Sequence, residues 1–417
     1  MKLRNAYIVL LSTLFPLSAH ADELLQIDMQ VGNSTGMFGF STVEDMITQY
    51  EGASLQDVFP AYVDNVTFVN STVDYRGLPM QLVFQTNSTV LQFTIPSLNI
   101  NETFDGQGDR DTALDQLEEY LKGQGGETAN LINRELIKIS PNSPVAGNPA
   151  SLMNSMVDNA FHSGTGHKKP SANIAAIAMA SDDMTEENKI GIGIDYAKYD
   201  QAGQDTDVWN VPLSYSFNLS EGRSLTIKAP ISYIDQEGSE TYKARLGASY
   251  QHPVNDHWIL TPVLEYGVVA SEELYDGGQI ISGSITSLFT FNSFKFIDEE
   301  ISISIGNMFG QYETMELEID DYEVDPDQEN TVYKHGIFVD TIVNIFEELP
   351  LNVEYIITDS RYKGDEVYAD QISEFGVSIK PAFASTRDDA LGLTLLYVRS
   401  PSAEDISGFQ SKLFYEF

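Results

Sequence analysis

The sequence predicts a mainly β protein, a twelve-stranded antiparallel transmembrane β-barrel preceded by a small α+β soluble domain. Three observations predict this fold. The chain opens with an export signal, alternating runs of membrane-strand length recur from residue 189 onward, and the last strand ends on the aromatic Phe417. Reading backwards from Phe417, alternate positions hold Tyr415, Leu413, Ser411 and Phe409, as expected for a strand with one face in lipid.

Residues 1–21 are predicted to be a signal peptide. Lys2 and Arg4 form a basic start, Ala6 to Leu17 is a short apolar core, and Ala19-His20-Ala21 matches a cleavage site. The apolar core is shorter than the ~20 residues that a membrane-spanning helix needs, and no later run reaches that length. Because only helices and closed barrels satisfy the backbone in lipid, we expect the exported chain to cross a membrane as a barrel.

Composition narrows the classes of function. The chain has no cysteine, which excludes a disulfide framework and a thiolate metal site and fits a bacterial outer membrane better than a eukaryotic secreted setting. Its formal charge is −39, or −41 once Lys2 and Arg4 leave with the signal peptide. Such an acidic surface argues against nucleic acid as a partner. We interpret the acidity as a solubility device, with divalent-cation binding as the alternative.

Residues 22–147 are predicted to form an exported α+β domain. Short alternating runs indicate strands with one buried face, and leucines at helical spacing indicate helices further along. The expected elements are strands at Leu25–Val31, Met80–Phe84 and Leu91–Ile95, a helix through Leu114, Leu117 and Leu121 that ends at Gly123–Gly126, and a helix at Thr128–Lys138.

An amphipathic helix is predicted at 148–163, followed by a linker at 164–188. Asn148-Pro149 has the form of an N-cap followed by proline at the first helical position. Within the linker, the apolar run Asn173–Ala180 has no assigned place, because as a strand it would make the number of barrel strands odd. The apolar stripe of the helix consists of Leu152, Met153, Met156, Val157, Ala160 and Phe161.

Residues 189–417 are predicted to form the barrel. Twelve runs alternate between apolar and polar residues over the length of a tilted membrane strand. A soluble sandwich is the alternative, since soluble sheets also alternate. The face opposite the apolar one would line a wet, ion-paired lumen and carries Lys228, Lys243, Arg245, Glu265, Glu354, Glu374 and Lys380.

The connections between these runs alternate in length, and this predicts an orientation. Short turns, such as 253–257, are expected in the periplasm, and longer polar loops, such as 200–207, 235–240 and 312–330, are expected outside. With twelve strands, Phe417 and the start of the first strand both fall on the periplasmic side. In 312–330 we expect the strand to continue beyond the membrane and to turn near Pro326.

The sequence offers little chemistry, so we predict that the protein is not an enzyme and has no catalytic, cofactor-binding or metal-binding residues and no cofactor. The histidines lack metal-ligand spacing, and His162-Ser163 is interpreted as chance proximity. Asp105–Asp111 lacks the length and closing glutamate of an EF-hand and is interpreted as a turn before a helix. The loop 312–330 is interpreted as a solvated acidic loop, with weak capture of Ca²⁺ or Mg²⁺ as the alternative.

Signal peptide, exported region, helix before the barrel and a final strand at Phe409–Phe417 together resemble solitary autotransporter-type outer-membrane barrels of Gram-negative bacteria. The resemblance covers residues 148–417 and implies that the barrel carries an upstream passenger to the surface while 148–163 fills the pore. Gly191, Gly193 and Gly247 would leave room for that helix. Two departures are the short upstream region, which lacks a repeated β-helix pattern, and the length of the linker.

Three hypotheses for function follow. The first is an outer-membrane anchor or translocator that presents the N-terminal domain. The second is a channel for small solutes with that domain as a periplasmic plug or partner-binding module, and the third and least supported is a hydrolase at the barrel rim. The expected partners are outer-membrane lipids and lipopolysaccharide, the barrel-assembly machinery through the C-terminal strand, and divalent cations at acidic outer loops.

Overall fold

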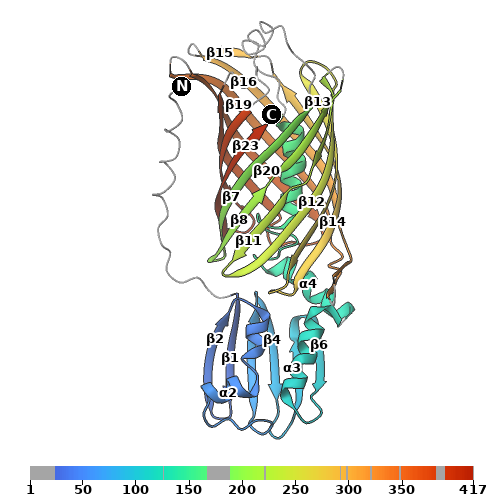
Figure 1. Cartoon of the computed structure of the whole chain (residues 1–417), viewed down its shortest axis with the longest axis vertical. Helices are drawn as coiled ribbons and strands as arrows, with labels where there is room; N and C mark the ends of the chain where they lie inside the picture. Colours follow the sequence, from blue (N-terminus) through green and yellow to red (C-terminus); the bar gives the residue numbers. More distant parts are fainter. Residues whose placement is uncertain are drawn as a thin grey trace.

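A computed structural model describes residues 24–124, 126–166, 188–219, 222–291, 293–296, 299–319, 322–346, 349–381 and 390–416. The predicted signal peptide, the run 173–180 and Phe417 lie outside these residues, as does most of the predicted linker. The described chain forms a closed barrel and a smaller domain packed on one end of it (Figure 1). We call this the domain end. The opposite end, where the first barrel strand begins and the last one finishes, is called the terminal end.

The N-terminal domain is a six-stranded antiparallel sheet with helices, ordered β2-β1-β3-β4-β5-β6. The expected strands at β1, β4 and β5 and the expected helices at α3 and α4 are confirmed. Strands β2, β3 and β6 and helices α1 and α2 were missed, and the edge strand β2 shows why, since it is largely exposed and has no alternating apolar run. The elements are β1 Leu25–Val31, β2 Ser34–Phe40, α1 Val43–Thr48, α2 Gly52–Val58, β3 Val69–Tyr75, β4 Leu78–Phe84, β5 Val90–Ile95, β6 Ile100–Asp105, α3 Arg110–Glu119 and α4 Glu127–Ile139.

The domain has its own apolar core. Alternate residues of β1, β4 and β5 are buried against Leu114 and Leu117 of α3, which is the face that the sequence pattern predicted. Arg110 is fully buried beside this core, where its guanidinium donates to the carbonyl oxygens of Thr67, Gln85 and Ser88. Each of its nitrogens therefore has an acceptor, as a buried charge requires.

The barrel is a closed antiparallel sheet of twelve strands, so the predicted fold class is confirmed. Leu413 pairs with Ile194 in the seam that closes it. Two of the strands are divided near Pro212 and Pro230, because proline has no N–H for the ladder. The strands are β7 Lys189–Gln201, β8 Gln204–Val211 with β9 Leu213–Asn218, β10 Ser224–Lys228 with β11 Ile231–Gln236, β12 Ser239–Pro253, β13 Trp258–Ser271, β14 Asp276–Thr290, β16 Glu299–Met315, β19 Glu329–Phe346, β20 Leu349–Gly364, β21 Gln371–Pro381, β22 Ala390–Arg399 and β23 Ile406–Glu416, with the short β15 Phe294–Phe296 beside β16.

The outer face of the barrel is apolar. Every second residue of most strands is a large, solvent-accessible apolar side chain, and aromatic residues recur toward both ends. A soluble barrel has no reason to expose such a continuous band, whereas lipid requires it. None of the helices in the described part of the chain has the length and apolar character needed to span a bilayer. The band includes Ile190, Ile192, Ile194, Trp209, Tyr242, Leu246, Leu264, Tyr266, Ile281, Ile285, Phe289, Phe309, Tyr333, Ile337, Tyr355, Ile357, Leu393, Leu395, Phe409 and Leu413.

Two expected long loops, 200–207 and 235–240, were wrong. In both places the strands continue to two-residue turns, at Ala202-Gly203 and Glu237-Gly238, whose central residues all have positive φ. Such turns match the twist of antiparallel strands, and glycine at the second position makes them favourable. In the acidic loop 312–330 the chain does continue as paired strands, β17 Leu317–Ile319 and β18 Tyr322–Val324. The reversal therefore precedes Pro326.

Candidate functional site: helix α5 in the barrel lumen

Helix α5, Leu152–Thr165, lies inside the barrel (Figure 1). Its N-cap is Ser151, whose hydroxyl accepts from the backbone N–H of Asn154. The predicted cap at Asn148 was wrong, because that side chain donates to the carbonyl oxygen of Ser143 in the preceding turn. The helix thus starts and ends a few residues later than expected.

Contacts with the wall give the direction of α5. A Cβ at Gly267, near the domain end of β13, would touch Leu152. A Cβ at Gly306, closer to the terminal end, would touch Thr165. The helix therefore enters the lumen from the domain end and points toward the terminal end, where β7 begins.

The predicted apolar stripe of α5 is buried along its whole length. Phe161 fits a recess formed by Gly306 and Gly336, which pair directly across β16 and β19. A Cβ at either glycine would come within 3.0 Å of the Phe161 ring, so only glycine leaves room for it. The ring also stacks on Phe338 with centroids 6.1 Å apart. Fully burying such an apolar side chain contributes about 1.5–3 kcal/mol.

A buried ion triad joins α5 to two strands. The Lys334 ammonium on β19 lies 2.5 Å from the Asp158 carboxylate of α5 and 2.6 Å from the Glu374 carboxylate of β21. Glu374 also accepts from the Thr358 hydroxyl at 2.5 Å. Because all three charges are largely removed from water, each depends on the others for its stabilisation.

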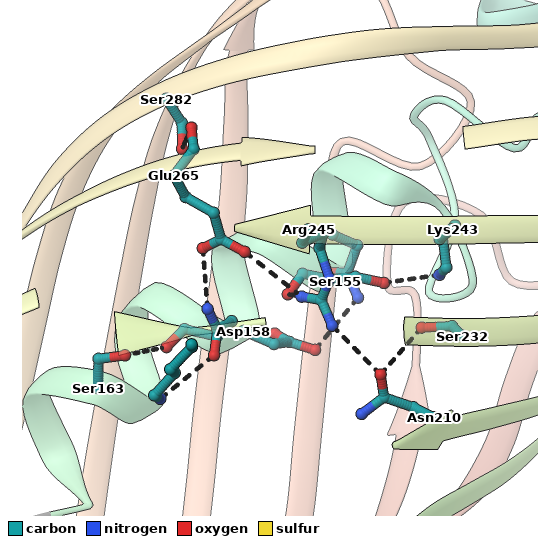
Figure 2. A network of polar contacts seen from close by, with 12 residues as sticks. Ser155, Asp158, Ser163, Asn210, Ser232, Lys243, Arg245, Glu265 and Ser282 are labelled. Atoms are coloured by element: carbon teal, nitrogen blue, oxygen red, sulfur yellow. Dashed lines mark hydrogen bonds and ion pairs between the residues drawn. The ribbon is translucent and has the colours of Figure 1, made fainter. Parts of the chain in front are cut away.

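A second group of polar contacts joins α5 to strands β12 and β13 (Figure 2). Lys243 donates to the carbonyl oxygen of Ala150 at 2.5 Å and to the Ser155 hydroxyl at 2.8 Å. Arg245 donates to the carbonyl oxygen of Ser155 at 2.5 Å and lies 3.7 Å from Glu265. Two basic residues of the wall therefore bind backbone oxygens near the start of the helix.

Asn159 bridges two further wall residues. Its Nδ2 donates to the Glu265 carboxylate at 2.9 Å, and its Oδ1 accepts from the Lys228 ammonium at 3.2 Å. On the other side of the helix, the Tyr362 hydroxyl donates to Asn154 at 2.8 Å. Polar residues of α5 thus contact several strands around the barrel, and the helix is fitted to this particular lumen.

Much of this wall was predicted from the sequence. Five predicted lumen residues contact α5, the residue Ala150 just before it, or Lys334, which pairs with it: Lys228, Lys243, Arg245, Glu265 and Glu374. Glu354 and Lys380 lie further toward the terminal end. Sequence reasoning missed Lys334, Asp195 and Lys412. Lys334 lay just outside the predicted run 335–346, although β19 starts at Glu329. Periodicity extended a few residues toward the loop would have found it.

The domain is joined to the barrel by a buried contact with the β13–β14 turn. Leu274 and Tyr275 of this turn belong to the apolar core of the domain. The Arg76 guanidinium lies 2.7 Å from the Asp276 carboxylate, and both side chains are buried. The Tyr75 hydroxyl donates to the carbonyl oxygen of Leu274 at 2.9 Å. The domain is therefore docked on the rim and shares a core with it.

At this contact the surroundings of Glu118 and Tyr275 favour an ionised carboxylate and a neutral hydroxyl. Burial alone would raise the pKa of Glu118, but hydrogen bonds from Lys122 and Tyr275 hold that pKa below its ordinary value. Burial and the Glu118 carboxylate raise the pKa of the Tyr275 hydroxyl. A neutral tyrosine therefore donates to an ionised carboxylate at neutral pH, across the junction of domain and barrel.

The candidate sites for other chemistry have ordinary structural contacts. The Ser163 hydroxyl donates to the carbonyl oxygen of Asn159 within α5. In the acidic loop, Arg134 of α4 donates to the carbonyl oxygen of Pro326 and pairs with the Asp327 carboxylate, so part of the loop packs on the domain. In the described ranges, no group of three or more histidine, aspartate or glutamate side chains is arranged to hold a metal ion.

Comparisons with solved structures give likenesses of low sequence identity. The β domain of the Bordetella autotransporter BrkA is 10% identical with a TM-score of 0.41, over 55% of this chain and 98% of that one. The translocator domain of the autotransporter NalP from Neisseria meningitidis is 9% identical with a TM-score of 0.42, over 63% and 97%. The NanC porin is 11% identical with a TM-score of 0.34, over 54% and 98%. No protein-family model and no curated protein matches the sequence.

The apolar outer band and the polar, filled lumen define the class of this protein as an outer-membrane β-barrel. In its twelve strands and in the helix that crosses its lumen, it resembles autotransporter-type barrels. Its distinctive parts are the α+β domain docked on the rim and the ion pairs that hold α5.

Proposed function

We propose that the barrel anchors the α+β domain on the outer surface of a Gram-negative cell, with α5 filling the pore behind it. The observation that carries this proposal is the place of the domain. The domain packs on one rim of the barrel, whereas β7 begins and β23 finishes at the opposite rim. In outer-membrane barrels of even strand number the two chain ends lie together on the periplasmic side, which puts the opposite end outside.

The path of the chain supports the same orientation. From the domain, α5 runs through the lumen toward the terminal end, and β7 starts there. This is the course that a chain follows when its upstream part has been carried outward through its own barrel. The buried pair of Arg76 and Asp276 then holds the domain on the rim.

The proposal assigns no catalytic role to the chain. Its partners are those that an outer-membrane anchor needs, namely lipids around the apolar band, lipopolysaccharide at the outer rim and the barrel-assembly machinery at β23. We retain divalent cations as candidate partners of the acidic outer loops, to be tested by calcium titration of the folded protein. The competing function is a small-solute channel with the domain as a periplasmic module.

Protease treatment of intact cells separates the two functions. A surface domain is degraded by added protease, while the barrel stays protected as a membrane fragment. A periplasmic domain is degraded only after the outer membrane has been opened, and that result would refute surface display. The periplasmic content of the same cells serves as the control for membrane integrity.

A further inference from the structure

Charged side chains of the wall face the polar side of α5 at mid-lumen, and we call these wall residues the lumen belt. Five are basic and three are acidic, so the wall carries a net charge of +2 at this level, inside a chain whose formal charge is −39. Among the side chains that the structure describes further toward the terminal end, Lys189 and Lys380 are equal in number to Asp340 and Glu354. The lumen belt consists of Lys228, Lys243, Arg245, Lys334 and Lys412 with Asp195, Glu265 and Glu374.

Helix α5 occupies the lumen belt as an anionic ligand would. It presents the Asp158 carboxylate to Lys334 and the Ser155 carbonyl oxygen to Arg245, while Lys243 binds the Ser155 hydroxyl and the Ala150 carbonyl oxygen just before the helix. Lys412 also lies near enough to attract the Asp158 carboxylate. The cations of the wall are thus bound to negatively charged or negatively polarised groups of the helix.

Helix α5 does not supply an ion-pair or hydrogen-bond partner for every charged group of the lumen belt. Among the described residues, Lys243 has no carboxylate within ion-pair distance, although its side chain is buried. The Nε of Arg245, another buried group, has no hydrogen-bond partner among the described residues, and neither does one carboxylate oxygen of Glu265. Removal of the helix would leave five cations facing water and solute, with three carboxylates to balance them.

We propose that the lumen belt makes the barrel an anion-selective channel whenever α5 is displaced. Cations arranged around a narrow pore with low-dielectric walls raise the local concentration of anions and repel cations. The ligand class is small anions, either inorganic or carrying carboxylate or phosphate groups. This activity does not depend on the side of the membrane on which the domain lies.

The test uses the full chain with residues 152–165 replaced by a glycine-serine segment of equal length. In a planar bilayer with a KCl gradient, this variant is expected to conduct more than the native protein, with a reversal potential that shows chloride to be the more permeant ion. Adding Lys243→Glu and Lys334→Glu changes the charge of the lumen belt from +2 to −2 and is expected to reverse the selectivity. Lys363→Glu, on the exposed face of β20, is the matched control and is expected to leave selectivity unchanged.

Each variant is first checked for a folded barrel by its change in electrophoretic mobility on heating. A pore that does not discriminate between chloride and potassium, or one that prefers potassium before the charge reversal, would overturn the proposal. No rise in conductance in the folded variant would overturn it as well, since the residues replaced would then not close the pore. None of these results affects the protease test of surface display, so the two proposals fail independently.

Discussion

Lys334 is predicted to be the residue on which the docking of α5 depends most. Its side chain is 2% exposed and neutralises two carboxylates, Asp158 on the helix and Glu374 on the wall. In Lys334→Met those carboxylates face each other without the cation that both of them contact. Breaking a buried pair in this way costs about 3–5 kcal/mol. Since 1.4 kcal/mol is a factor of ten, α5 is expected to open about 10²- to 10⁴-fold more often.

Hydrogen exchange of the α5 amides measures that opening directly. The expected result is faster exchange across residues 152–165, with exchange in the barrel strands unchanged. Lys363→Met is the matched control, because its pair with Asp370 at 3.7 Å is exposed and worth at most about 1 kcal/mol. Adding Asp158→Asn and Glu374→Gln to Lys334→Met should restore most of the protection. Exchange in Lys334→Met that equals the native rate would refute the reasoning.

Three further predictions concern the recess and the rim. Gly336→Leu places a side chain where even a Cβ would lie 2.8 Å from the Phe161 ring, so it should expel α5 and give a conducting pore in planar bilayers; a closed pore would contradict this. Arg76→Met leaves the buried Asp276 carboxylate unpaired, so the domain should lose about 3–5 kcal/mol of stability in denaturant titrations, and Asp276→Asn should recover much of it. Because the pKa of Glu118 is lowered in the folded protein, its stabilisation is present at neutral pH and is lost as the pH falls through that lowered pKa. Limited proteolysis should therefore show that docking of the domain on the rim weakens on acidification, and that it weakens less in Glu118→Gln.

The barrel was predictable because lipid imposes a strict pattern on sequence. A strand with one face in lipid must alternate, and Ile190, Ile192 and Ile194 on β7 are alternate apolar residues exposed on the outer face. Inward charges at Lys243 and Glu265 followed from the same alternation. The apolar stripe of α5 was equally visible, because it repeats at helical spacing.

The remaining features depend on contacts between distant parts of the chain. No local pattern shows that Lys334 meets Asp158, 176 positions away, or that Gly306 and Gly336 form a recess for Phe161. The packing of Leu274 into the core of the domain is likewise a tertiary contact. The edge strand β2 was missed for a different reason, since only Phe38 and Phe40 pack on the core and two such residues are too few to show alternation.

Surface display of the domain is tested most directly by labelling single cysteines, which the native chain lacks. Met37→Cys lies on the edge strand β2 at a position 76% exposed, and Val254→Cys lies in the turn at the terminal end at a position 42% exposed. A membrane-impermeant maleimide added to intact cells should label Met37→Cys, and should label Val254→Cys only after the outer membrane is opened. The reverse pattern would place the domain in the periplasm and contradict the proposed orientation.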